Sequence, residues 1–177
     1  PGAPARPGSL SAITALTADF NLPEDAPEGE RRAALARWIT AKENPLTWRS
    51  AVNRTWQQHF GRGLVDTPGD FGRMGSLPSH PELLDWLARW FRDDAHGSIK
   101  SLRRLIVTSA TYRQSTIPLP AALAADADNR LLSHANRSRL DAEAVRDALL
   151  LASGRLYLRM GGPGDRQFDL QPGIHVT

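Results

Sequence analysis

A long glycine-rich stretch between two segments of helical periodicity constrains this chain more than any other feature. It runs from Gly61 to Pro78 and holds five of the fourteen glycines. Compact domains seldom contain so long a stretch without regular structure unless it is a packed functional loop or a disordered one. Its larger apolar residues are Leu64, Val65, Phe71, Met74 and Leu77. Because apolar side chains favour burial, we predict an ordered loop packed against the neighbouring helices.

The spacing of apolar residues along the rest of the chain indicates the fold class. Apolar residues that recur every three or four positions are typical of helices that bury one face. This spacing predicts helices over residues 29–42, 45–60, 98–112 and 138–153, a further helix that opens at residue 79, and a short helical piece over 126–132. No segment with the period of a strand is longer than residues 155–159. We predict an all-α fold, a compact bundle of about five helices with irregular N- and C-terminal arms.

Local signals mark where several of these helices begin and end. Asn44 precedes a proline and is a good N-cap for the second helix. Gly61 is a suitable stop for the same helix. Ser79 and Glu82 have the spacing of a capping box, in which each side chain satisfies one free backbone N–H group. Ser98 is expected to cap the fourth helix.

Helical spacing also predicts which side chains face the interior. The tryptophans that fall on core stripes are Trp38, Trp56, Trp86 and Trp90. The inward residues of the fifth helix are Leu140, Val145, Ala148, Leu149 and Ala152. We therefore expect all five helices to contribute to one core.

Length and composition fit one globular domain inside a longer polypeptide. The chain has 177 residues, enough to bury a core, with 41% hydrophobic and 23% charged residues. We predict an extended, Pro-rich N-terminal arm over residues 1–28, a helical domain over 29–154 and an irregular C-terminal segment over 155–177. The sequence has no initiator methionine and ends without a closing element, so we expect a fragment of a longer protein.

Residue usage excludes some classes of function. The absence of cysteine excludes disulfides, thiolate metal ligands and a cysteine nucleophile, and it leaves the compartment open. The sequence contains no run of about 18 apolar residues, so no transmembrane helix is predicted. All but two of the 22 basic residues are arginine, which favours bidentate contacts to carboxylate or phosphate. The acidic residues are interspersed, whereas a nucleic-acid surface is one-sided. We expect neither membrane insertion nor nucleic acid as a partner.

Two histidines bracket the glycine-rich loop, and this is where catalytic chemistry is conceivable. His59 and His80 with a loop carboxylate such as Asp70 have ligand types that a metal accepts. The spacing matches no compact ligand motif, and a buried His59 bonded to the loop backbone is the commoner arrangement. We predict no metal and no cofactor. The sequence contains no nucleophile elbow, P-loop or dinucleotide fingerprint. The catalytic candidates are therefore His59, Asp70, His80, Tyr112 and Arg113.

Binding candidates lie around the same loop. Its glycines offer backbone N–H groups that could cradle an anion, although glycines in tight loops usually serve backbone geometry alone. Arginines on both sides of the loop could form a basic face. The candidate binding residues are Arg54, Arg62, Gly63, Phe71 and Arg73.

Three stretches carry a resemblance to a known family. The first runs from Asn53 to Leu87 and contains HFGRGLV, TPGDFG and PSHPELLDWL, and the second runs from Ser98 to Ser115. The third is RLDAEAVRD from Arg139 to Asp147, followed by Gly-Gly-Pro at residues 161–163. Over roughly residues 30–165 the chain closely resembles the planctomycete-type domain of unknown function 1553 family.

The resemblance implies a context rather than a reaction. Such domains typically form the C-terminal part of large exported proteins, which implies a periplasmic or cell-surface location. The implied partners are neighbouring domains of the full-length protein, among them a cytochrome c-like domain in some members. No established catalytic residues come with the family.

Our leading hypothesis is a non-catalytic helical interaction or scaffold domain that docks through the loop over residues 61–78. One alternative is a hydrolase-type enzyme domain with a pocket near His59, Asp70 and His80, acting on polysaccharide. The second alternative is an anion or nucleic-acid binding module.

Overall fold

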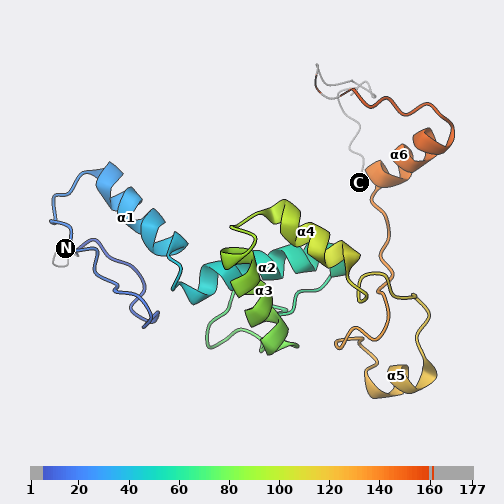
Figure 1. Ribbon diagram of the computed structural model, residues 1–177, viewed down its shortest axis with the longest axis horizontal. Helices are drawn as coiled ribbons and strands as arrows, with labels where there is room; N and C mark the ends of the chain where they lie inside the picture. Colours follow the sequence, from blue (N-terminus) through green and yellow to red (C-terminus); the bar gives the residue numbers. More distant parts are fainter. Residues whose placement is uncertain (1–5, 160, 162–177) are drawn as a thin grey trace, which may run out of the picture. The chain divides into compact units, whose positions relative to one another are not determined.

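The protein is all-α, as the apolar spacing predicts. The computed structural model describes residues 6–159 and 161. This part of the chain contains six helices, which are labelled in Figure 1. They are α1 (Glu28–Thr40), α2 (Pro45–Phe60), α3 (Pro81–Asp93), α4 (Ile99–Thr108), α5 (Pro120–Ala125) and α6 (Ala142–Ala152). Within the described residues the only β-type pairing is one isolated antiparallel bridge between Gly8 and Asp19.

The chain divides into two units after Ser138. The first unit holds α1 to α5, and the second begins at Arg139 and holds α6. Our domain boundaries at residues 28/29 and 154/155 stay a prediction.

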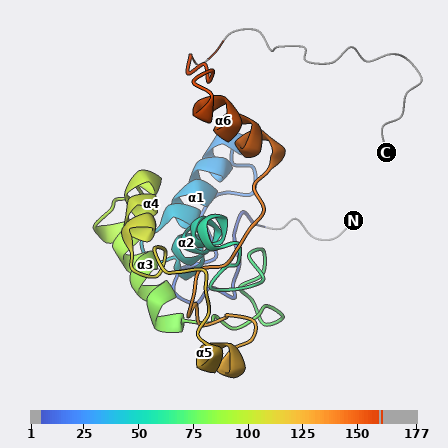
Figure 2. The same cartoon turned by 90° about the vertical axis from the view of Figure 1, so that its right-hand side faces the viewer.

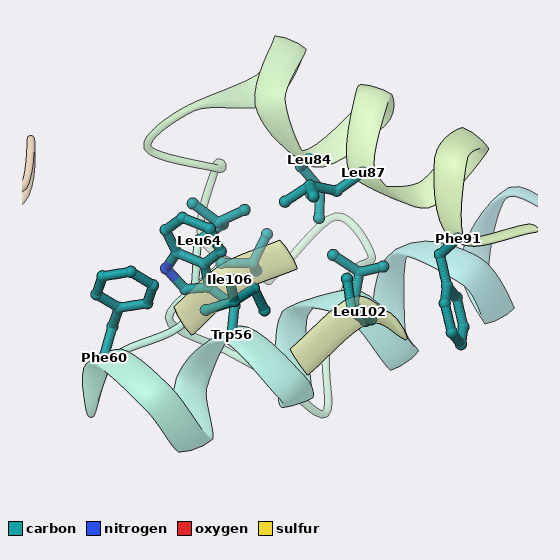
Figure 3. Close-up of a cluster of buried hydrophobic side chains, with 10 residues drawn as sticks. Trp56, Phe60, Leu64, Leu84, Leu87, Phe91, Leu102 and Ile106 are labelled. Atoms are coloured by element: carbon teal, nitrogen blue, oxygen red, sulfur yellow. The ribbon is translucent and has the colours of Figure 1, made fainter. Parts of the chain in front are cut away.

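Three helices form the core of the first unit. Both α3 and α4 pack on α2, and they lie beside it in both views of the molecule (Figures 1 and 2). Side chains from the three helices and from the loop after α2 meet in one cluster (Figure 3). Its buried members are Val52, Trp56, Phe60, Leu64, Val65, Leu84, Leu87, Phe91, Leu102 and Ile106. Their spacing within each helix is the period of an amphipathic helix, so the core follows from the sequence pattern.

The ends of α2 and the start of α4 confirm the local signals. The Asn44 side chain accepts hydrogen bonds from the backbone N–H groups of Leu46 and Thr47, at 3.0 and 3.3 Å. Gly61 ends α2 with φ of 77°, a left-handed conformation that glycine adopts without strain. Ser98 caps α4 by accepting from the N–H group of Ser101.

The predicted capping box of α3 is wrong. His80, not Ser79, occupies the N-cap position, and no side chain bonds to the free N–H groups there. The Ser79 hydroxyl instead lies 3.3 Å from the Leu64 carbonyl and 2.9 Å from the His80 ring. Ser79 therefore ties the end of the loop to its beginning, a tertiary contact that the local motif does not encode.

Three helix boundaries differ from the prediction. Helix α4 ends at Thr108 rather than at residue 112, because Ser109 is extended and its hydroxyl bonds to the Ile106 carbonyl. The short helix α5 covers 120–125, not 126–132, since its proline occupies the first turn. Helix α6 begins four residues later than expected, where the Asp141 side chain caps it by accepting from the N–H group of Ala144 at 2.6 Å.

Several predicted core residues are exposed. Helix α6 has no buried residue. We expected five side chains on or beside this helix to face the interior, and all five are exposed: Leu140, Val145, Ala148, Leu149 and Ala152. Trp86 on α3 is 47% exposed, and in the loop Met74 and Leu77 are 89% and 84% exposed. Helical spacing identifies an apolar face, but it does not say whether another element covers that face.

Candidate functional site

The loop over residues 61–78 is ordered, and one buried asparagine fixes its first half. Asn53 on α2 has no exposed surface. Its amide nitrogen donates to the Val65 carbonyl at 2.9 Å, and its amide oxygen accepts from the Val65 N–H group at 2.8 Å. A Cβ atom on Gly63 would lie 2.5 Å from the Val65 carbonyl oxygen and 2.9 Å from both polar atoms of the Asn53 amide. Only glycine fits beside this pair of hydrogen bonds.

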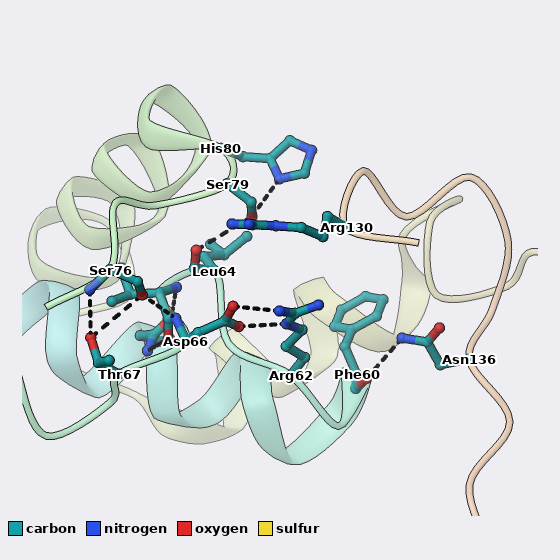
Figure 4. Close-up of polar contacts among 12 residues, drawn as sticks. Phe60, Arg62, Leu64, Asp66, Thr67, Ser76, Ser79, His80, Arg130 and Asn136 are labelled. Atoms are coloured by element: carbon teal, nitrogen blue, oxygen red, sulfur yellow. Dashed lines mark hydrogen bonds and ion pairs between the residues drawn. The ribbon is translucent and has the colours of Figure 1, made fainter. Parts of the chain in front are cut away.

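A ring of short hydrogen bonds closes the second half of the loop (Figure 4). The Thr67 hydroxyl donates to the Asp70 carbonyl at 2.7 Å and accepts from the Ser76 N–H group at 3.0 Å. The Ser76 hydroxyl in turn accepts from the N–H group of Asp66 at 3.0 Å. The loop is thus bonded to itself as well as to α2, which gives it a defined shape without regular secondary structure.

An arginine–carboxylate pair braces the base of the loop. Arg62 donates two hydrogen bonds of 2.6 Å to the two carboxylate oxygens of Asp66 (Figure 4). These bonds lower the pKa of Asp66 below its ordinary value; partial burial opposes the shift, and the charge of Arg130 assists it. The pair keeps Asp66 ionised and engages two nitrogens of the Arg62 guanidinium within the loop.

A second buried asparagine orders the segment that lies against the end of α2. Asn129 is 5% exposed and has a left-handed backbone with φ of 49°. Its amide donates to the His134 carbonyl at 2.8 Å and to the Asn136 side chain at 2.9 Å. Asn136 in turn donates to the Phe60 carbonyl at 3.4 Å (Figure 4). Sequence reasoning predicted a short helix over residues 126–132 and missed the turn at Asn129, although an asparagine, which tolerates the left-handed region, was a signal for a tight turn.

The structure brings together only two of the catalytic candidates. The rings of His59 and Tyr112 have centroids 6.1 Å apart, and both line a hollow of about 690 Å³ with Gln114 and Arg137 among its walls. His59 is half-buried, and its Nδ1 lies 2.7 Å from the Thr55 carbonyl in the same helix. A carbonyl only accepts, so Nδ1 is the donor of this hydrogen bond.

The other catalytic candidates do not line this hollow. The Asp70 carboxylate accepts from the Gly72 N–H group at 2.8 Å, and His80 contacts Ser79. Arg113 is exposed just after α4. No group of three or more His, Asp or Glu side chains in the described part of the chain is arranged to hold a metal ion.

The binding candidates are spread over different structural roles. Gly63 and Arg62 shape and brace the loop, and Phe71 packs against the core cluster. Arg54 and Arg73 are exposed, the first on α2 and the second on the loop. The five residues therefore do not form a single anion-binding pocket.

The class of protein defined by this geometry is an all-α domain in which a hydrogen-bonded loop is buttressed on a three-helix core. None of the helices in residues 6–159 combines the length and apolar character needed to cross a bilayer. The model of a protein family of unknown function, DUF1553, matches residues 31–173, and the chain belongs to that family. The resemblance seen in the sequence is thereby confirmed. No curated protein and no solved structure matches the chain.

Proposed function

We propose that this chain is a non-catalytic helical interaction domain of a larger exported protein, and that the loop over residues 61–78 is its docking surface. The observation that carries this proposal is an internally hydrogen-bonded loop with two large exposed apolar side chains. Met74 and Leu77 are 89% and 84% exposed, while hydrogen bonds from Asn53 and Thr67 hold the loop below them.

A loop already ordered before association loses little conformational entropy when a partner binds. Two large apolar side chains on such a loop would gain free energy when a partner removes them from water. Arg73, exposed beside them, adds a positive charge at the edge of the patch. The partner that suits this surface is a neighbouring domain of the same polypeptide with an apolar groove rimmed by carboxylates. The family resemblance implies a cytochrome c-like domain as a neighbour in some members.

The test is to change the tip of the loop and measure docking within the full-length protein. Met74→Glu together with Leu77→Glu should weaken binding between this chain and the remainder of its polypeptide, supplied separately, by at least about tenfold in titration calorimetry. The melting temperature should stay unchanged, because neither side chain is part of the core.

Ile117→Glu is the matched control, because this residue is 72% exposed but lies outside the loop. Equal losses of binding for the control and the loop variant would contradict the proposal. Export is tested separately by fractionating native cells: we expect the full-length protein outside the cytoplasm, and recovery in the cytoplasmic fraction would refute that part of the proposal.

A further inference from the structure

A tryptophan on α3 forms the centre of an exposed patch that is separate from the loop. Trp86 is 47% exposed, and its ring stacks on that of Trp90 with centroids 6.4 Å apart and an interplanar angle of 20°. Beside it lies a hollow of about 300 Å³ whose walls include Leu83, Leu105 and Thr108. A large aromatic side chain next to an apolar hollow is a typical anchor of a protein interface.

Two opposite charges flank Trp86 along the same face of the helix. Glu82 and Arg89 are both exposed, and neither forms an ion pair within the described residues. The Asp85 carboxylate, one turn before Arg89, is already engaged by Arg49 at 2.6 Å, and Arg89 Nε donates only to the Asp85 backbone carbonyl, at 3.4 Å. At about 100° per residue, the three positions 82, 86 and 89 fall within about 60° of the helix circumference.

This face is complementary to itself. Glu82 lies about 6 Å on one side of Trp86 along the helix axis, and Arg89 about 4.5 Å on the other, from the helical rise of 1.5 Å per residue. In an antiparallel pair of α3 helices with Trp86 at the two-fold axis, Glu82 of each copy faces Arg89 of the other. A parallel pair would instead place like charges together, so the charges select the antiparallel arrangement.

We propose that the Trp86 face of α3 binds a second copy of this chain in an isologous, antiparallel dimer. Each Trp86 ring enters the hollow beside Leu83 and Leu105 of the other copy, and two Glu82–Arg89 ion pairs close the ends. An isologous contact uses the same patch on both partners, which a self-complementary surface satisfies. One pair of helices gives an interface at the small end of the range, below about 1,200 Å², so the dimer dissociates on dilution.

Sedimentation velocity of the chain over a concentration series tests the dimer. We expect a reversible monomer–dimer equilibrium for the wild type and a monomer for Trp86→Ala. Glu82→Arg and Arg89→Glu should each raise the dissociation constant at least about tenfold, because each places like charges at both symmetric contacts. Lys100→Glu, an exposed charge reversal on α4, is the control and should leave the equilibrium unchanged.

Mixing the two single variants separates this interface from any general effect of charge. An equimolar mixture of Glu82→Arg and Arg89→Glu should form a heterodimer, and the double variant should recover the homodimer, because both restore opposite charges across the axis. The proposal is overturned if the wild-type chain stays monomeric over the whole concentration series. In that case the Trp86 face would bind a different partner. It is also overturned by a dimer that the single reversals do not weaken.

Discussion

At the scale of single residues, the buried asparagine of α2 matters more than any of the catalytic candidates. The two hydrogen bonds of Asn53 satisfy both backbone groups of Val65, which is itself buried. Asn53→Ala would leave those two groups without partners inside the core. We expect a loss of about 3 kcal/mol in the free energy of unfolding, from about 1–3 kcal/mol for each unsatisfied buried group.

Urea denaturation at constant m-value measures this loss. Arg54→Ala, a change at the next and exposed position of the same helix, is the control and should alter stability by no more than about 0.5 kcal/mol. Similar midpoints for the two variants would show that the loop does not depend on the asparagine.

The ion pair at the base of the loop predicts how stability varies with pH. The hydrogen bonds from Arg62 lower the pKa of Asp66 below its ordinary value of 3.8. A carboxyl group whose pKa is lower in the folded state stabilises the fold above its unfolded pKa. This contribution is lost as the pH falls through the folded value. Asp66→Asn should therefore be less stable than the wild type at neutral pH, and the difference should shrink as the pH falls below 3.8.

The midpoint of urea denaturation, measured across this range of pH, checks the prediction. In an Arg62→Gln background the Asp66→Asn change should have little further effect, since the two side chains act as one pair. A difference between the wild type and Asp66→Asn that persists unchanged in acid would rule out the ion pair as its cause.

At the scale of elements, the junction between α1 and α2 depends on one capping residue. Asn44 is 2% exposed; it caps α2 and also donates to the Trp38 carbonyl in the last turn of α1, at 3.2 Å. Asn44→Ala should destabilise the chain by about 2 kcal/mol, the upper part of the range for losing an N-cap. Asn44→Ser retains an acceptor for the cap and should cost less. Thermal denaturation compares the two, and equal losses would contradict a capping role.

Helix boundaries show what local signals can and cannot predict. The start of α2 at Pro45 and its stop at Gly61 were predictable, because both signals act within one turn of the helix. The capping box at Ser79 failed, because its hydroxyl bonds to Leu64, fifteen residues earlier. A capping motif competes with every tertiary contact that its side chain can reach, and the sequence does not reveal which contact is within reach.

At the scale of the whole molecule, the division after Ser138 predicts where the chain can be shortened. All residues of the core cluster lie between Val52 and Ile106, within the unit that ends at Ser138. A chain that stops at Ser138 should therefore keep the urea midpoint of the full chain.

Stopping at Ser115 is the contrasting truncation. It removes Asn129 and the hydrogen bond from Asn136 to the Phe60 carbonyl, and it should lower the midpoint. If the chain that stops at Ser138 failed to fold, the residues beyond it would be part of the core.

The candidate site was predictable as a place but not as a constellation of groups. The glycine-rich loop was recognisable because glycines and prolines interrupt the helical period over a long stretch. The contact between His59 and Tyr112 was not recognisable from the sequence, because it depends on how α2 lies against the chain after α4. Nor did the spacing show that Asp70 and His80 bond within their own segments.

The sequence by itself determined the helical class, the core stripes of α2, α3 and α4, and the family, because helix period, caps and motif strings are properties of neighbouring residues. Only the tertiary structure decided that Asn53 holds the loop, that Ser79 joins its ends, and that Met74, Leu77 and Trp86 stay exposed. Those features depend on contacts between residues far apart in the chain. The free energy of each side chain there is set by what covers it, not by its neighbours in sequence.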